Sequence, residues 1–337
     1  MIRAAIVGIG RWGRTLVGAV QGKSEQISFT AGHNRTRANA ESFCAEHGIA
    51  LKDSLDEILL DPAIDAVVFA TPHSEHGGQI EAAAAAGKHV FMEKPFTLDR
   101  GSAVRALDAA ARARIVLGVA YPRRLHPATK ELKARIDDGR IGTIAHCHSE
   151  QNSPAGLFMD PRSWRALASE APAGGMTASG VHNLDLMIHL FGRIDEVYAR
   201  SLRRKVSYDA DDTTSVMLGF AGDMSGTLLC SLVTAVGYRL AVFGSEGCAE
   251  VLTPRGDFHF TATPAAMPAG RHTQAAPEII EYPGFNAIRA ELEAFAAAID
   301  GRAPYPIPAA EVLHGVCAFE AIVRSAATGQ PVKVARD

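Results

Sequence analysis

The chain has 337 residues, 47% of them hydrophobic, and its 34 basic and 37 acidic residues give a formal net charge of −3 at pH 7. This length exceeds the usual size of one hydrophobic core, so we expect two domains, and the apolar content excludes a chain that is disordered throughout. The balanced charge gives no sign of a nucleic-acid-binding protein or of a surface for anionic membranes, so a small-molecule ligand is expected.

We expect neither a membrane span nor a targeting segment. No apolar run reaches the roughly 18 residues of a spanning helix. The apolar stretch Met1–Val7 is too short for a signal peptide and runs directly into a glycine turn. The 5 cysteines are scattered and lack a C-x-x-C spacing, which favours reduced packing residues over disulfides or a zinc site. A cytoplasmic protein without a metal site is therefore expected.

The first third of the chain alternates short β-branched runs with alanine-rich stretches, a pattern typical of βαβ units and a parallel sheet. Strands are predicted at 2–7, 27–31, 66–70, 89–92 and 116–120, with a weaker one near Ile49. Helices are predicted near 11–21, 36–47, 54–60, 75–86 and 99–113. Residues 1–121 are therefore predicted to form an α/β Rossmann domain, a doubly wound parallel sheet with helices on both faces.

After Tyr121 the pattern changes to strands in which apolar and polar residues alternate. These strands are predicted at 143–150, 194–202, 213–220, 225–233 and 238–243. Helices are predicted near 127–138, 177–191, 286–299 and 309–327. Residues 122–337 are therefore predicted to form an α+β domain that binds the substrate on a large, mostly antiparallel sheet.

Two stretches of this second domain, 153–176 and 253–284, are rich in Pro and Gly and are predicted to be irregular loops that determine substrate specificity. One face of an antiparallel sheet packs on helices while the other needs cover. We therefore expect a homodimer or homotetramer assembled across the faces of the second sheet.

The first predicted strand leads into G-x-G-x-x-G at the start of a helix, the setting of a dinucleotide-binding turn. Gly8 permits the tight turn, Gly10 lets the backbone approach a pyrophosphate, and Gly13 allows the helix to pack closely on the strand. Arg11 and Trp12 lie between these glycines, at a helix N-terminus that supplies N–H donors. Trp12 either covers the dinucleotide or packs in the core. A nicotinamide dinucleotide is the predicted cofactor.

The segment Asn34-Arg35-Thr36-Arg37, after the second predicted strand, determines which dinucleotide is expected. An NAD-preferring domain usually carries Asp or Glu about 20 residues beyond the glycine turn, to hold the ribose 2′-hydroxyl. Here no acid is present, and two guanidinium groups and a hydroxyl can bind a 2′-phosphate through charge-assisted hydrogen bonds. We predict NADP over NAD, with arginines on a solvated helix face as the alternative.

Three further stretches carry candidate catalytic side chains: Ala70–His76, His89–Phe96 and Gly174–Asp185. The first two follow parallel strands, so they lie at the carboxyl edge of the sheet, where doubly wound folds bind ligands. Together with the glycine turn they resemble the glucose-fructose oxidoreductase, inositol dehydrogenase and rhizopine-catabolism (Gfo/Idh/MocA) family. The resemblance spans nearly the whole chain, and E-K-P at Glu93–Pro95 is its most specific part.

The resemblance implies roles for individual residues. It implies that Thr71 and Pro72 form the loop beside the nicotinamide ring, that Glu93 and Lys94 lie beside the cofactor ribose and the substrate, and that His182 is the acid/base residue. These roles are chemically sound, because an ammonium stabilises a developing alkoxide while an imidazole accepts the hydroxyl proton near neutral pH.

The sequence departs from the family at one position. Sugar- and polyol-oxidising members commonly carry an aspartate four residues before the histidine, and here that residue is Ala178. Asp185, which lies one helical turn after His182 and can hydrogen-bond the histidine or substrate hydroxyls, could replace it. Thr177 or the substrate itself could also do so, or Lys94 could lead proton transfer, or the protein is not a conventional alcohol dehydrogenase.

Other candidates are less specific. His76 either contacts the ligand or, with His73, caps the helix that begins near Ser74. His146 and His148 share one strand face but have no third spaced ligand, so no metal site is predicted. Arg124 follows the domain junction, from which it could reach the cleft.

The leading prediction is an NADP(H)-dependent oxidoreductase that transfers hydride between the nicotinamide and a CH–OH or carbonyl group of a sugar, polyol or related small molecule. Two alternatives remain open. One is an oxidoreductase for a non-sugar carbonyl or a diol, and the other is a non-catalytic regulator that senses dinucleotides.

Overall fold

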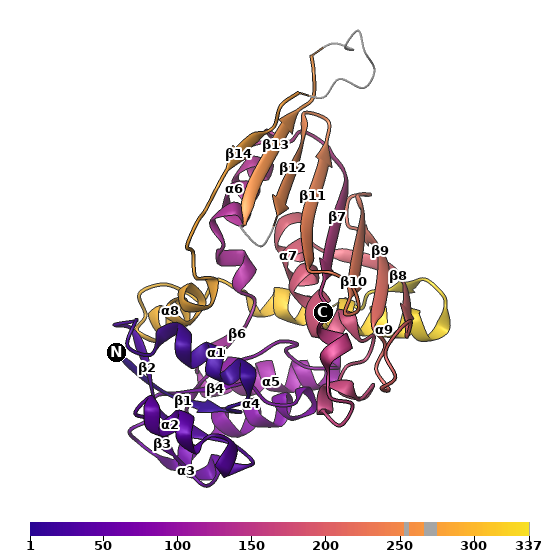
Figure 1. The fold of residues 1–337 in the computed structure, drawn as a ribbon. Helices are drawn as coiled ribbons and strands as arrows, with labels where there is room; N and C mark the ends of the chain where they lie inside the picture. Colours follow the sequence, from indigo (N-terminus) through magenta and orange to yellow (C-terminus); the bar gives the residue numbers. More distant parts are fainter. Residues whose placement is uncertain (253–255, 266–274, 337) are drawn as a thin grey trace. The chain divides into compact units, whose positions relative to one another are not determined.

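The computed structural model describes residues 1–252, 256–265 and 275–336. These residues belong to two compact units (Figure 1), each built on one β-sheet. The first unit comprises Met1–Pro122 and Asn286–Val316, and the second comprises Arg123–Phe285 and Cys317–Asp337. No helix of the described residues is long and apolar enough to cross a membrane.

The first unit carries a six-stranded parallel sheet in the order β3-β2-β1-β4-β5-β6. Its strands are β1 (Ile2–Val7), β2 (Ile27–His33), β3 (Ala50–Leu51), β4 (Ala66–Phe69), β5 (His89–Met92) and β6 (Leu117–Val119). Its helices are α1 (Arg11–Val20), α2 (Glu41–Glu46), α3 (Leu55–Leu60), α4 (His76–Ala85), α5 (Arg100–Ala113) and α8 (Ala287–Ile299). The order reverses between β1 and β4, as in a doubly wound fold, so the predicted Rossmann domain is confirmed.

The first unit extends beyond the segment predicted for it, because it also contains residues 286–316. Leu292, Phe295 and Ala296 of α8 are fully buried in the same core cluster as the apolar residues of β1 and β5. The Phe295 ring packs edge-on against Phe91, with the ring centroids 5.5 Å apart. The chain boundary expected at residue 121 therefore omits a helix that returns to the first core from far along the sequence.

The second unit carries a nine-stranded sheet in the order β14-β13-β12-β11-β7-β10-β9-β8-β15. Its strands are β7 (Ile144–Asn152), β8 (Ile194–Leu202), β9 (Thr213–Phe220), β10 (Ser225–Ser231), β11 (Gly237–Gly244), β12 (Gly247–Leu252), β13 (Asp257–Ala262), β14 (Glu278–Ile280) and β15 (Val332–Lys333). All neighbours are antiparallel except β7 and β10, which run parallel. The prediction of a mostly antiparallel sheet is confirmed.

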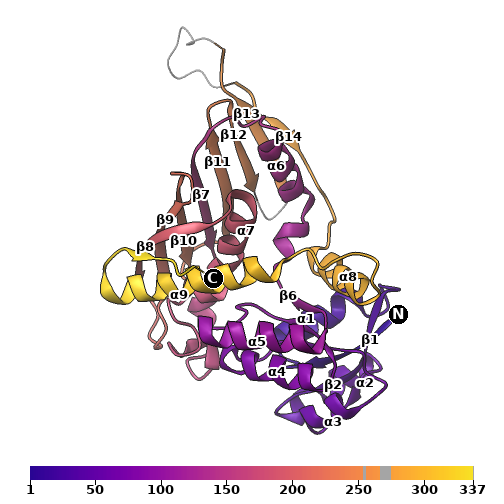
Figure 2. The same ribbon diagram turned by 180° about the vertical axis from the view of Figure 1, so that it is seen from behind.

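Helices cover one face of this sheet. Here α6 (Pro127–Asp137) and α7 (Val181–Phe191) lie over it, as Figure 2 shows, whereas α9 (Ala309–Thr328) contributes residues to both units. Side chains alternate accordingly along β9, where Val216 and Leu218 are buried while Met217 is exposed.

The prediction of an irregular loop at 253–284 is wrong in part. Residues 257–262 and 278–280 form β13 and β14, which pair with each other at the edge of the sheet. Residues 253–255 and 266–274 lie outside the described residues. The pattern failed here because glycine, proline and threonine around the strands indicate turns, whereas pairing to β12 supplies the order.

Candidate functional site

The glycine turn between β1 and α1 is shaped by close backbone contacts. Gly8 adopts a φ of +90°, and a Cβ atom there would lie 2.4 Å from the Ala70 carbonyl oxygen. A Cβ atom on Gly13 would lie 2.2 Å from the Gly8 carbonyl oxygen. At Gly10, in contrast, a Cβ atom would meet nothing within 4 Å in the described residues. The fold therefore requires the outer two glycines, while the middle one leaves open space beside the backbone.

The N-terminus of α1 opens at the same place. Gly10 is the N-cap residue, no side chain of the described residues caps it, and the first turn, which includes Arg11 and Trp12, carries no acid. The first N–H groups of a helix have no intrahelical acceptor and lie at the positive end of the helix dipole. This turn fits the diphosphate of a dinucleotide, because backbone N–H groups can donate to the phosphate oxygens and the open space beside Gly10 can hold them.

Some side chains of the segment after β2 bond to other parts of the protein, and others are exposed to solvent. Asn34 ties the glycine turn to β2, since its Oδ1 accepts from the Ile9 N–H at 3.0 Å and its Nδ2 donates to the Thr36 carbonyl at 2.8 Å. Arg37 forms ion pairs with Glu41 and Asp53.

Arg35 differs from Arg37, because it is exposed and its guanidinium has no hydrogen bond or ion pair within the described residues. Thr36 is exposed beside it. Of the two arginines predicted to bind a 2′-phosphate, only Arg35 has its charge uncompensated by a carboxylate of the described chain.

Glu93 connects the glycine helix to the end of β5. It is 6% exposed and follows β5 directly. One carboxylate oxygen accepts from the Trp12 indole N–H, and the other accepts from the Lys94 backbone N–H at 3.2 Å. Trp12 itself is half-buried and packs against the core of the first unit. The structure thus brings together Trp12, Glu93 and Lys94. The Trp12 ring packs against the core, and its indole N–H donates to Glu93.

His76 connects the loops that follow β4 and β5. Its ring is fully buried, with Nδ1 2.8 Å from the Pro95 carbonyl oxygen and Nε2 3.3 Å from that of Thr71. Thr71 donates its hydroxyl to Gln79 at 2.6 Å, and Pro72 precedes a short 3-10 turn. His76 therefore lies at the junction of two predicted ligand loops and orients their backbones.

In the second unit, His182 lies in the first turn of α7 and is half-buried. The helix predicted at 177–191 consists of two parts, a π-helical turn at Met176–Gly180 followed by α7. Thr177 lies in the π-helical turn, fully buried, and its hydroxyl donates to the Pro172 carbonyl. That bond directs the hydroxyl of Thr177 away from the orienting role considered for it.

Asp185 is held by Arg124 in a buried ion pair. Arg124 Nε donates to Asp185 Oδ2 at 2.8 Å and a terminal guanidinium nitrogen donates to Oδ1 at 2.5 Å, and both side chains are nearly inaccessible. The same guanidinium lies 3.4 Å from His189 Nδ1. Arg124, which the sequence suggested for the cleft, is thus buried against α7, where it forms an ion pair with Asp185.

The sequence did not single out the surroundings of Arg123. Its guanidinium donates to Asn183 Oδ1, donates to Gln151 Oε1 at 2.5 Å, and lies 4.2 Å from the centre of the Tyr238 ring. Burial raises the pKa of the Tyr238 phenol, an effect that the Arg123 charge opposes. The only feature of the sequence that pointed to these residues was that Asn183 directly follows the candidate His182.

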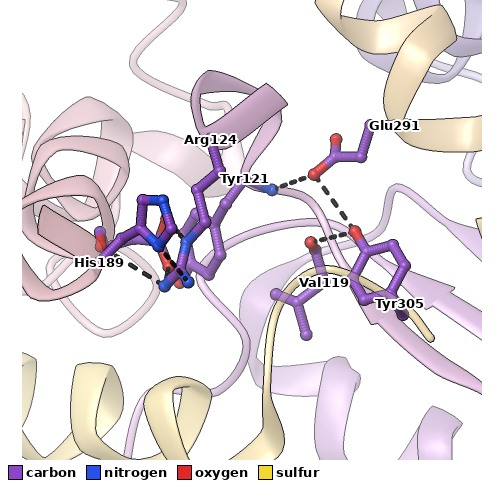
Figure 3. Close-up of polar contacts among 7 residues, drawn as sticks. Val119, Tyr121, Arg124, His189, Glu291 and Tyr305 are labelled. Carbon is purple, nitrogen blue, oxygen red and sulfur yellow. Dashed lines mark hydrogen bonds and ion pairs between the residues drawn. The ribbon is translucent and has the colours of Figure 1, made fainter. Parts of the chain in front are cut away.

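A second buried carboxylate lies within the first unit. Glu291 of α8 is 2% exposed and accepts from the Tyr121 N–H at 2.5 Å and from the Tyr305 hydroxyl at 3.3 Å (Figure 3). The Tyr305 hydroxyl also donates to the Val119 carbonyl at 2.8 Å. Glu291 and Tyr305 therefore fix the end of β6, just before the chain passes into the second unit.

The histidines of β7 bond to neighbouring hydroxyls. His146 lies 2.8 Å from Ser225 Oγ, and His148 Nδ1 lies 2.9 Å from Thr227 Oγ1. Among the described residues no cluster of three or more His, Cys, Asp or Glu side chains could hold a metal ion.

Residues 2–121 match the profile of an oxidoreductase family with an NAD-binding Rossmann fold, and residues 129–250 match the GFO/IDH/MocA C-terminal domain. The scyllo-inositol 2-dehydrogenase (NAD(+)) of Bacillus subtilis is 30% identical over 270 residues, which cover 75% of each chain. A trans-1,2-dihydrobenzene-1,2-diol dehydrogenase of Oryctolagus cuniculus is 26% identical over 242 residues, 71% of each chain. A solved structure of levoglucosan dehydrogenase with NADH shares the fold, with a TM-score of 0.87, 22% identity and full coverage (100%) of both chains.

Proposed function

The chain belongs to the Gfo/Idh/MocA family of oxidoreductases, and from this membership we propose that it transfers a hydride between a nicotinamide dinucleotide and a CH–OH or carbonyl group of a sugar, polyol or related small molecule. The observation that carries the proposal is the glycine turn, whose open space at Gly10 adjoins an uncapped helix N-terminus. In this proposal residues 1–121 bind the dinucleotide, and residues 122–337, apart from the helix that joins the first core, bind the substrate.

Lys94 and His182 carry the proposed chemistry. A bound nicotinamide supplies the site that gives or accepts hydride. The Lys94 ammonium stabilises negative charge on the reacting oxygen, and the His182 imidazole takes or returns the hydroxyl proton. Glu93 accepts from the Lys94 backbone N–H and so positions the residue. Because the Thr177 hydroxyl donates to the Pro172 carbonyl, Asp185, Lys94 or a substrate hydroxyl is proposed to replace the carboxylate absent at Ala178.

For the dinucleotide we propose NADP over NAD. Arg35 with its free charge, next to the Thr36 hydroxyl, supports a 2′-phosphate site, and no acid follows β2 in the place that binds a ribose 2′-hydroxyl. The ion pairs of Arg37 weaken its part in that site. The name of the Bacillus subtilis relative carries NAD(+), which makes the cofactor the first property to measure.

Turnover tests the catalytic proposal. The purified protein is assayed with each dinucleotide against inositols, aldoses, alditols and a trans-diol, and reduced nicotinamide is followed by its absorbance. We expect turnover of at least one carbinol substrate, and Lys94→Met should lower kcat by about 100-fold or more. Lys130→Met, which removes an exposed lysine of α6, is the matched control.

The outcomes separate the alternatives. Wild-type turnover in Lys94→Met would contradict the role of Lys94. Oxidation of the trans-diol in preference to sugars would select the second candidate, a diol dehydrogenase, which the rabbit relative supports. Tight dinucleotide binding without turnover of any substrate would favour the non-catalytic regulator.

We also propose a homodimer or homotetramer that buries the helix-free face of the second sheet. Met217 on that face is 61% exposed, and His146, His148 and Glu150 of β7 lie on it half-buried. Light scattering at micromolar concentration should give at least twice the chain mass, and a monomer would contradict the proposal.

A further inference from the structure

Arg123 and Arg124 are neighbours in the sequence but differ in how their charges are compensated. Arg124 is neutralised by the buried carboxylate of Asp185. Arg123 contacts only uncharged groups in the described part of the chain: the side-chain amide oxygens of Asn183 and Gln151 and the ring of Tyr238. Arg123 is half-buried, so its positive charge is only partly hydrated and no carboxylate of the described residues balances it.

Asn183 adds an unused donor to the same place. Its side chain is fully buried, and its Nδ2 has no hydrogen-bond partner among the described residues. The orientation of this amide is fixed, because a guanidinium only donates and must face the oxygen of Asn183. Nδ2 is therefore the atom of this amide that Arg123 does not use, and its N–H groups are unpaired within the described residues. A buried donor without an acceptor destabilises the fold, so the fold leaves this donor for another molecule.

The cluster of Arg123, Asn183, Gln151 and Tyr238, which we term the donor cluster, lies next to the proposed acid/base residue. Asn183 follows His182 in the first turn of α7. A guanidinium has five N–H donors, and the contacts to Asn183 and Gln151 use one terminal nitrogen each, so further donors remain. The site thus offers donors and one positive charge, and it lacks an opposing negative charge.

We infer that the donor cluster binds a carboxylate of the substrate, so that the preferred substrate is a sugar acid and not a neutral sugar or polyol. A carboxylate has two acceptor oxygens and a negative charge, which match the remaining N–H groups of Arg123 and the Nδ2 of Asn183. A hydroxyl would satisfy one donor but would leave the guanidinium charge unbalanced. The inference rests on the proposed oxidoreductase function and names its substrate class.

The test uses pairs of sugars that differ only at C6: glucose with glucuronate, and galactose with galacturonate. The full-length protein is assayed with the dinucleotide that it binds. We expect kcat/KM for the acid to exceed that for the neutral partner by about tenfold or more. Arg123→Met should abolish this preference, because KM for the acid should rise by about 30-fold and by a larger factor than KM for the neutral sugar.

Controls separate a local effect from misfolding. Arg204→Met removes the same charge from an exposed loop of the second unit and should leave the preference intact. Arg123→Lys keeps the charge without the planar fork and should retain part of the preference. Asn183→Asp places a carboxylate beside Arg123 and should weaken binding of the acid more than that of the neutral sugar. Thermal unfolding of each variant identifies any that do not fold.

Each outcome has a defined meaning. Equal use of acid and neutral sugar by the wild type, or a preference that persists in both Arg123→Met and Asn183→Asp, would overturn the inference while the oxidoreductase function stands. Preference for glucose 6-phosphate over glucuronate would also overturn it. If none of these sugars is oxidised, calorimetry of the same pairs on the dinucleotide-loaded protein decides the inference separately from the proposed function. Selective binding of the acid that is lost in Arg123→Met supports the inference, and absence of such binding refutes it.

Discussion

The glycine turn of the first unit and the His182 helix of the second unit are held in place by different kinds of contact. The turn is shaped by backbone atoms, since Gly13 approaches the carbonyl oxygen of Gly8 close in sequence and Gly8 approaches that of Ala70. The helix is fixed by side chains far apart in sequence, since Arg124 and Asp185 are 61 positions apart. Short-range backbone contacts leave a residue pattern that can be recognised, whereas long-range side-chain pairs do not. The cofactor-binding residues are therefore easier to predict from the sequence than the substrate-binding residues.

The largest effect is expected at the Arg124–Asp185 pair. Arg124→Met leaves the Asp185 carboxylate buried without its partner, which should lower the free energy of unfolding by about 3–5 kcal/mol. Removing both charges in Arg124→Met/Asp185→Leu should cost markedly less, because no buried charge is left over. Urea unfolding measures both. The neighbouring Arg123→Met is the matched control, and a loss as large as that of Arg124→Met would contradict the difference drawn between these arginines.

The glycine turn allows a sharper test, because two of its glycines should respond in opposite ways. Gly13→Ala forces a methyl group against a backbone oxygen 2.2 Å away, so it should destabilise the protein by about 2 kcal/mol or more. The methyl group of Gly10→Ala meets no atom of the described residues within 4 Å and should change stability by less than about 0.5 kcal/mol. It should nevertheless weaken dinucleotide binding by about tenfold, since the methyl group occupies the space proposed for the diphosphate.

Thermal unfolding and dinucleotide titration of the two variants measure these effects. Undiminished dinucleotide affinity in Gly10→Ala would show that the diphosphate does not approach this residue. Equal melting temperatures for the two variants would show that the helix can retreat from Gly8.

The same distinction explains which parts of the fold were predictable. The Rossmann strands were recognised because they are short, mostly apolar runs, and Ala66–Phe69 is uninterrupted and buried throughout. The return of α8 to the first core was not predictable, because the partner of Phe295 is Phe91, far away in the sequence. The strands β13 and β14 were missed because their order comes from neighbouring strands and not from their own composition.

In the candidate site, the sequence identified candidate residues but not their hydrogen-bond and ion-pair partners. Thr177 and Asp185 were both considered as partners for His182, but the sequence did not indicate that Thr177 donates to the Pro172 carbonyl or that Asp185 pairs with Arg124. His76, suggested as a ligand residue or a cap, lies between the backbones of two loops. None of these partners lies at a helical or strand spacing, so periodicity carries no information about them.

A smaller effect is expected from the two arginines after β2. Arg35→Ala should reduce any preference for NADPH over NADH by about tenfold, or roughly 1.4 kcal/mol, because it removes the uncompensated charge. Arg37→Ala should change the preference by less than about threefold, since Glu41 and Asp53 already balance that side chain. Titration of wild type and both variants with each dinucleotide measures this. A wild type that prefers NADH would show that Arg35 is a surface residue.

The smallest effect concerns His126, whose contacts are both local and distant. Its Nδ1 caps α6 by accepting from the Ala128 N–H at 3.2 Å, and its ring packs edge-on against Tyr282 and Phe285. Burial lowers the pKa of His126. The unfolded chain therefore takes up the proton at a higher pH than the folded protein does, so the stability that His126 contributes is complete above about pH 6.5 and declines as the pH falls through the folded-state pKa.

Protonation also removes the Nδ1 acceptor and with it the cap, which is worth about 1 kcal/mol. His126→Asn keeps a capping oxygen but does not titrate. Between about pH 7.5 and about pH 5, which lie on either side of the usual histidine pKa, its melting temperature should therefore fall less than that of the wild type. The other titrating groups are common to both proteins and cancel in the difference. Parallel curves would mean that the ring keeps its proton state across this range and that the distant aromatic contacts, not the local cap, determine what His126 contributes.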